Sequence, residues 1–236
     1  MDISSIMEII RKHLRSFITI SFCLSCHFAF SFCGNTGMTK SENGYVGVEN
    51  NDTPVSKMYF RDPFIYADAT NNCYCFITTS IENGVGELVA YTSKDLKYWK
   101  RSGIVYKASK SYLGMKDWWA ADLYHWKGAY YVFVTLSGNG ITRGTTVFKS
   151  SRHAIGAYHP ILSDNQLNVT PANMDCLDGS LYIDDKGVPW MIYSHEWIEC
   201  YNGEIYAQRL KNDFSGTIGK PVYLFKASDA PCLLSP

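Results

Sequence analysis

Three aspartates recur along the chain and are candidates for a group of interacting carboxylates. Asp62, Asp122 and Asp178 each open an aromatic-rich segment, with separations of 60 and 56 residues. Carboxylates that share one pocket repel one another, so their pKa values separate: one can act as a base while another is held protonated or tunes its neighbour. A single aspartate more often caps a turn by accepting bonds from backbone amides. The recurrence in three segments favours a shared site.

Each of these aspartates begins a unit of three to four expected strands. An aromatic-bearing strand is followed by a turn, a second alternating strand and a third strand, and the turns carry Asn71–Asn72, Lys127–Gly128 and Lys186–Gly187. Alternation with Gly, Asn and Asp about every 8–12 residues indicates antiparallel strands. A repeat of this kind and length is typical of a β-propeller blade. A sandwich with coincidentally similar hairpins is the alternative.

The sequence therefore predicts an all-β protein, with a partial propeller of about three blades over residues 57–236. The first strand of every blade lies nearest the central axis, so we expect the three aspartates to meet at one mouth of the channel. Propellers close with about four to eight blades. We therefore expect the domain to be incomplete, with a further blade beginning near residue 236.

Composition narrows the function classes. The 22 Lys and Arg residues balance 22 Asp and Glu residues, which gives no electrostatic reason to expect nucleic acid or an acidic membrane as a partner. Five of the eight cysteines lie after the first 33 residues (Cys73, Cys75, Cys176, Cys200 and Cys232). They are an odd number without paired zinc motifs, so we expect buried free thiols. No cofactor is predicted, and nothing in the sequence indicates a calcium ion in the channel.

The N-terminal segment is predicted to direct export. Basic residues precede an uncharged stretch at 16–33, which indicates a signal peptide over residues 1–33. A membrane anchor is the alternative. Cys33 resembles the acylated cysteine of a bacterial lipoprotein, although Phe32 is larger than the residue usual before it, and residues 34–56 have the composition of a linker. We expect a periplasmic or cell-surface protein whose only contact with a membrane is through this leader or a lipid.

Four stretches, taken together and in order, resemble glycoside hydrolase family 43, the five-bladed propeller enzymes that cleave arabinan, xylan and related chains. They are RDPFIYAD (61–68), YTSKDLKYWKRSG (91–103), WWAADLYHWKGAYYVFVT (118–135) and LDGSLYIDDKG (177–187). The resemblance covers roughly residues 57–228. It implies an inverting hydrolysis that uses three carboxyl groups.

The resemblance also implies roles for single residues. The family's general base matches Asp62 in its Arg-Asp-Pro motif. The carboxylate that tunes and orients the acid matches Asp178, although Gly179 stands where the family usually has proline. A Trp-Ala-Pro-Asp motif matches the stretch from Trp119 to Asp122, which places Trp119 and Asp122 in the lining of the substrate pocket.

The family's general acid is a glutamate at the start of the fourth blade, and no glutamate follows Glu204 in this chain. A local candidate is the stretch His195–Trp197, which should lie beside Asp178 because antiparallel strands return to their start. Glu196 is the candidate acid, His195 a donor to a sugar hydroxyl and Trp197 a surface for stacking on a sugar ring. The alternative is a polar rim without a catalytic role. No metal site is predicted, because HEWIE lacks the second histidine of a zinc-binding helix.

These inferences converge on a glycosidase of the arabinofuranosidase, xylosidase or arabinanase type. Its expected partner is an oligo- or polysaccharide of the plant cell wall, and we expect a monomer when the domain is complete. The alternative is a non-catalytic, carbohydrate-binding propeller lipoprotein.

Overall fold

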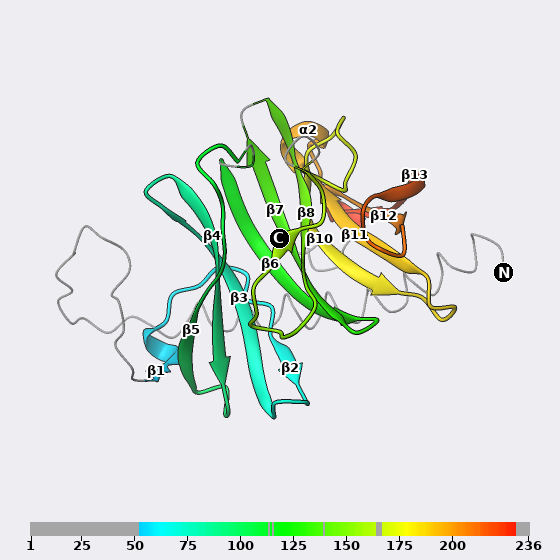
Figure 1. Ribbon diagram of the computed structural model, residues 1–236. Coiled ribbons are helices and arrows are strands. Elements are labelled where there is room, and N and C mark those ends of the chain that lie inside the picture. Colours follow the sequence, from blue (N-terminus) through cyan, green and yellow to red (C-terminus); the bar gives the residue numbers. More distant parts are fainter. Residues whose placement is uncertain (1–51, 113, 115, 139, 164–166, 230–236) are drawn as a thin grey trace. The chain divides into compact units, whose positions relative to one another are not determined.

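A computed structural model describes residues 52–112, 114, 116–138, 140–163 and 167–229 (Figure 1). The predicted signal peptide, the predicted lipid site at Cys33 and most of the predicted linker lie outside these residues. Within the described part of the chain, no helix is long and apolar enough to cross a membrane.

Antiparallel hairpins build three sheets. The first sheet has the order β1 (Thr53–Pro54), β5 (Tyr98–Lys107), β4 (Val85–Ser93), β3 (Cys73–Glu82), β2 (Tyr66–Asp68). The second has the order β6 (Asp117–Trp126), β7 (Ala129–Gly138), β8 (Ile141–Ser150), β9 (His159–Pro160). The third has the order β10 (Cys176–Ile183), β11 (Pro189–His195), β12 (Glu204–Leu210), β13 (Thr217–Lys226). Short helical turns lie at η1 (Val55–Lys57), α2 (Trp197–Cys200) and η2 (Ala227–Asp229).

This arrangement confirms the predicted all-β fold with about three blades. Figure 1 shows the sheets side by side, and contacts join β3 to β6 and β10 to β6, β7 and β8. The first blade also gains an outer strand, because Thr53–Pro54 pairs with Tyr98–Trp99. Those two residues fall within the stretch 34–56 that the sequence indicates as a linker.

Turn chemistry explains why neighbouring strands fold back on one another. Asn83 and Gly84 join β3 to β4 with φ of 52° and 74°, and Lys127 and Gly128 join β6 to β7 with φ of 46° and 79°. Two consecutive residues with positive φ form the hairpin turn whose twist matches that of the strands. Glycine takes the second position in both turns at no steric cost.

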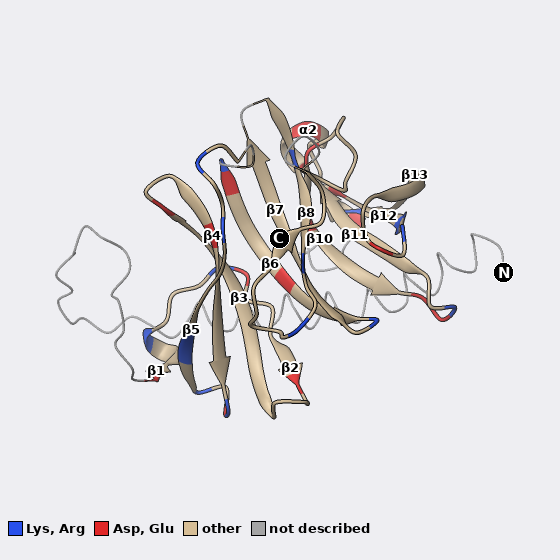
Figure 2. Cartoon of the chain, in the orientation of Figure 1, with Lys and Arg blue, Asp and Glu red and all other residues tan. Residues whose placement is uncertain are grey.

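Strand β7 carries the core on both faces. Its alternate residues Tyr130, Val132 and Val134 join the hydrophobic cluster shared with the first blade, whereas Tyr131 and Phe133 join the cluster shared with the third blade. This follows from the period of two along a strand. Figure 2 shows the consequence: β7 carries no charge, and most charged residues lie in turns at strand ends. Burying each large apolar side chain contributes about 1.5–3 kcal/mol, so β7 fixes the blades beside it.

Candidate active site

Backbone conformation identifies the equivalent position in each blade. Asp62, Ala120 and Asp178 have φ of 49°, 25° and 52°, and each lies 58 residues from the next. Ala120 is the extra residue of a bulge in β6, and Asp178 lies in a bulge of β10. A left-handed conformation is strained for residues other than glycine and is often found at functional sites. The blades thus present one repeated, strained position.

This repeat corrects the expected register of Asp122. The predicted alignment placed Asp122 level with Asp62 and Asp178, but the residue at that level in the second blade is Ala120. Asp122 lies two residues further along β6, at the level of Ser180 in β10. The reason is the bulge at Ala120, which adds a residue that strand alternation does not reveal.

The side chain of Asp122 nevertheless reaches the other two carboxylates. Tyr124 Oη and Ser180 Oγ both donate to Asp122 Oδ2, at 2.9 Å and 2.8 Å. Burial, helped by the charges of Asp178 and Asp62 and opposed by the two hydroxyl donors, raises the pKa of Asp122 to about 6. The three aspartates therefore lie within one electrostatic environment, as repelling carboxylates in a shared pocket do.

Asp178 is held by the second blade. Its backbone N–H donates to Thr135 Oγ1 at 2.9 Å, and the Thr135 hydroxyl donates to Asp178 Oδ1 at 3.4 Å. Burial raises the pKa of Asp178, the charge of Asp62 adds to the increase, and Arg61 opposes it. Asp178 is thus positioned by a fixed hydroxyl and sensitive to the charge of Asp62.

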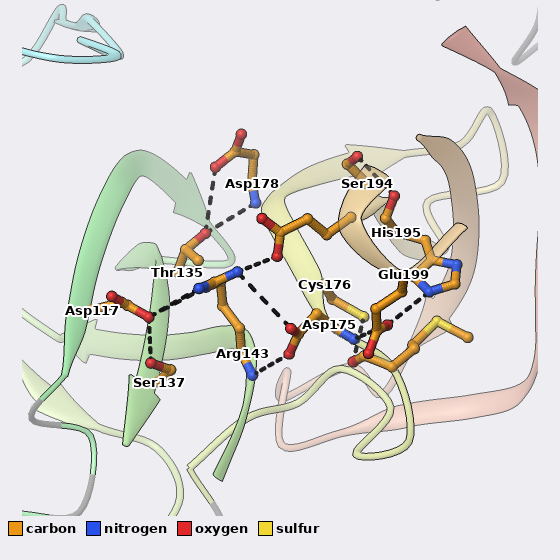
Figure 3. A network of polar contacts seen from close by, with 12 residues as sticks. Asp117, Thr135, Ser137, Arg143, Asp175, Cys176, Asp178, Ser194, His195 and Glu199 are labelled. Carbon is orange, nitrogen blue, oxygen red and sulfur yellow. Dashed lines mark hydrogen bonds and ion pairs between the residues drawn. The ribbon is translucent and has the colours of Figure 1, made fainter. Parts of the chain in front are cut away.

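A partly buried arginine, Arg143, joins the second and third blades next to Asp178 (Figure 3). The Arg143 guanidinium on β8 lies 3.3 Å from Asp117 Oδ2 and forms an ion pair with Glu196. Its backbone N–H donates to Asp175 Oδ1 at 2.8 Å, and its guanidinium lies over the Trp119 ring at 4.5 Å from the centroid. The predicted acid candidate Glu196 is therefore buried and bound to a cation.

Aromatic side chains flank these charges. Trp118 and Trp119 face opposite ways, as adjacent strand residues do: Trp118 is buried, whereas 39% of Trp119 is exposed. Trp197 follows Glu196 and is 65% exposed at the start of α2. Both predicted stacking residues are accessible to a sugar.

His195 lies where its strand predicts, at the end of β11 opposite Cys176. Both of its ring nitrogens turn toward carboxylates: Nε2 is 2.8 Å from Glu199 Oε2 and Nδ1 is 3.5 Å from Glu204 Oε2. The ring is thus engaged by neighbours from α2 and β12.

Sequence reasoning missed Arg143, Asp117, Thr135 and Ser180. The one usable signal is Arg143, a charge inside the strand ITRGTTVFKS whose other central residues are uncharged. A charged residue is rarely buried without a partner, so that position indicates a buried ion pair. The partners themselves come from other strands, and nothing local in the sequence names them.

Comparison with known proteins places this geometry in a family. The family model "Glycosyl hydrolases family 43" matches residues 51–234. The comparison with curated proteins found no match. Among solved structures, the endo-arabinase from Bacteroides thetaiotaomicron VPI-5482 is 42% identical with a TM-score of 0.69, covering 78% of this chain and 62% of that one.

More distant structures share the fold. An endo-1,4-beta-xylanase from Bacteroides thetaiotaomicron VPI-5482 is 20% identical with a TM-score of 0.54, covering 67% of this chain and 50% of that one. A thermostable family-43 glycoside hydrolase is 19% identical with a TM-score of 0.58, covering 70% and 52%. The chain thus spans about three fifths of the endo-arabinase and about half of these two. It belongs to glycosyl hydrolase family 43.

Proposed function

We propose that this chain supplies the general base, and the aspartates that support it, of an inverting glycoside hydrolase that acts on arabinan. The observation that carries the proposal is the repeated strained position, which brings Asp62 and Asp178 from separate blades into one group of coupled carboxylates with Asp122. The 42% identity to an endo-arabinase supports arabinan over xylan as the substrate.

In this proposal Asp62 is the general base. An inverting glycosidase activates a water molecule on one face of the sugar and protonates the leaving oxygen on the other, with the two carboxyl groups about 6.5–9.5 Å apart. Asp62 removes the proton of the water as the oxygen attacks the anomeric carbon. A base must be ionised before reaction, and the nearby Arg61 supplies a positive charge to this group of carboxylates.

Asp178 and Asp122 have supporting roles. Burial and then the charge of Asp62 raise the pKa of Asp178. Asp178, held by Thr135, positions the reacting groups. Asp122, with a pKa of about 6, is protonated in part of the molecules near neutral pH, where its carboxyl group can donate a bond to a sugar hydroxyl. Trp119 and Trp197 stack on sugar rings at the edge of the site.

In this proposal the general acid comes from the part of the endo-arabinase fold that the match to this chain leaves uncovered. Glu196 would have to leave the buried ion pair with Arg143 before it donated a proton. Its role is to hold Arg143 against Trp119, which keeps that indole in place. Incompleteness of the domain over residues 57–236, and export by the predicted signal at residues 1–33, are parts of the same proposal.

A chimera tests this function. Residues 52–229 replace the matching part of the Bacteroides thetaiotaomicron endo-arabinase, so that all three aspartates come from this chain. We expect release of oligosaccharides from arabinan with inverted configuration at the new reducing end, measured by proton NMR during the first turnovers, and little release from xylan. Retained configuration would contradict the mechanism, and preference for xylan would contradict the substrate.

A non-catalytic sugar-binding protein is the second candidate. One observation favours it: the candidate acid Glu196 forms an ion pair with Arg143. The same chimera separates the two functions. Arabino-oligosaccharide binding in calorimetry without turnover would support the second candidate.

A further inference from the structure

Three side chains of different chemistry converge beside α2, outside the group of aspartates. His195 ends β11, Cys200 ends α2 and Glu204 begins β12. The ligand atoms of these residues, a ring nitrogen, a sulfur and a carboxylate oxygen, all lie within 4.8 Å of one another. We call these three residues the α2 cluster.

The histidine of the α2 cluster has an unexplained ring nitrogen. His195 Nε2 lies 2.8 Å from Glu199 Oε2, and that carboxylate also accepts the Asp175 backbone N–H at 2.8 Å. A carboxylate oxygen that already accepts a backbone N–H is placed as an acceptor for the ring as well. His195 Nε2 therefore carries the proton that it donates.

Nδ1 is the ring nitrogen that this contact leaves over. It is buried and has no hydrogen-bond partner among the described residues, and Glu204 Oε2 lies 3.5 Å from it. A metal cation between these two atoms would bind both.

We propose that the α2 cluster binds a zinc ion through His195 Nδ1, Cys200 Sγ and Glu204 Oε2. Nitrogen, thiolate and carboxylate are ligands that Zn²⁺ accepts together, whereas Ca²⁺ and Mg²⁺ require oxygen alone. Neighbouring ligands of a tetrahedral zinc ion lie about 3.3–3.7 Å apart at bond lengths of roughly 2.0–2.3 Å. The separation of Nδ1 from Oε2, 3.5 Å, already lies in this range.

The surroundings resemble those of other metal sites. Histidine ligands usually donate their second N–H to a carboxylate, which fixes the ring; here Glu199 accepts it. Glu204 Oε2 accepts the hydroxyl of Tyr206 at 2.7 Å. Thiolate and carboxylate together balance the two charges of the ion. Cys200 gives up only weak S–H contacts to the carbonyls of His195 and Glu196, and its proton is released on binding.

Such an ion would tie α2 to strands β11 and β12. It would fix the turn that carries Glu196 and the exposed Trp197, next to the proposed sugar site. The proposal stands on the α2 cluster alone and does not depend on the glycosidase function.

A second group in the described residues serves as an internal control. Asp68, Cys73 and Cys75 also lie within 4.8 Å of one another, on the hairpin of β2 and β3. Asp68 is already committed to the turn, because its two oxygens accept from the amide of Thr70 and from the amide and side chain of Asn71.

Cobalt substitution tests the proposal on the full chain. The protein is reduced, stripped of metal by a chelator and titrated with Co²⁺, while the near-ultraviolet thiolate-to-cobalt charge-transfer absorption is recorded. Zn²⁺ is then added in competition. Cys200→Ser and Cys73→Ser are the matched variants, and Glu204→Gln, which keeps an acceptor for Tyr206, is a third. Circular dichroism shows whether each variant is folded.

We expect the chain and Cys73→Ser to bind one equivalent of Co²⁺ with the charge-transfer band, and Zn²⁺ to displace it. Cys200→Ser should lose the band, and zinc affinity should fall about 10–100-fold or more in both Cys200→Ser and Glu204→Gln. The proposal is overturned if the unmodified chain shows no band. It is also overturned if Cys73→Ser loses the band while Cys200→Ser keeps it.

Discussion

Replacing Arg143 with methionine perturbs the contact between the second and third blades at its most charged point. The variant keeps most of the length of the side chain but removes the cation that Asp117 and Glu196 share. It also removes the stack on Trp119.

The magnitude follows from burial. The side chains of Arg143, Asp117 and Glu196 are 16%, 14% and 8% exposed, so solvent screens the charges poorly. Breaking a buried ion pair from one side costs about 3–5 kcal/mol, mainly because the remaining charge stays buried without a partner. We therefore expect Arg143→Met to lower the free energy of unfolding by about 3–5 kcal/mol.

Urea denaturation followed by tryptophan fluorescence measures this loss. Adding Glu196→Gln to Arg143→Met should recover part of it, because one unpaired carboxylate is removed, and the double-mutant cycle should give a coupling of about 1–3 kcal/mol. Arg152→Met is the control at an exposed arginine and should cost less than about 0.5 kcal/mol. A loss below about 1 kcal/mol for Arg143→Met, with no coupling, would refute the reasoning.

Three further outcomes are expected. A β-carbon at Gly86 would overlap the buried Trp118 ring, so Gly86→Ala should cost about 1–3 kcal/mol in urea denaturation. A β-carbon at Gly216 meets only the flexible Lys211 side chain, and an equal loss for Gly216→Ala would contradict the packing argument. Burial raises the pKa of Asp122 from 3.8 to about 6, so its contribution to stability is present below about pH 4 and is lost as the pH rises through 6. Between pH 4 and pH 8 the unmodified chain should therefore lose about 1–3 kcal/mol more of its free energy of unfolding than Asp122→Asn loses. Equal losses in the two proteins would show that the pKa of Asp122 is not raised. Trp197→Ala should leave stability unchanged, because the side chain is 65% exposed, while the chimera should lose about tenfold in affinity for arabino-oligosaccharides in calorimetry; unchanged affinity would remove Trp197 from the sugar site.

The sequence was sufficient to predict the blades because their signals are local. Alternating strands and turn pairs such as Lys127–Gly128 lie within a few residues of each other, and the 58-residue period repeats them. The level of Asp122 was mispredicted for the opposite reason. The bulge at Ala120 depends on how β6 pairs with β7, and aligning aspartates by residue type hides an inserted residue.

The charged contacts of the site depend on distant parts of the chain. Arg143 and Glu196 are 53 residues apart, and the bond from Ser180 to Asp122 spans 58. No pattern within one strand indicates which residue of the next blade will pair with the charged residue of that strand. The α2 cluster likewise takes its residues from β11, α2 and β12, so the missing helical zinc motif in HEWIE does not test the proposed ion.

The central claim is that Asp62 is the base of an inverting hydrolase. The most direct test compares Asp62→Asn with the unmodified chimera, measuring turnover of an arabino-oligosaccharide and, by calorimetry, its affinity. An amide of the same shape cannot accept the proton of water, so we expect turnover to fall by a factor of about 10²–10⁴ while affinity changes little. Turnover within tenfold of the unmodified chimera, at unchanged affinity, would contradict the account.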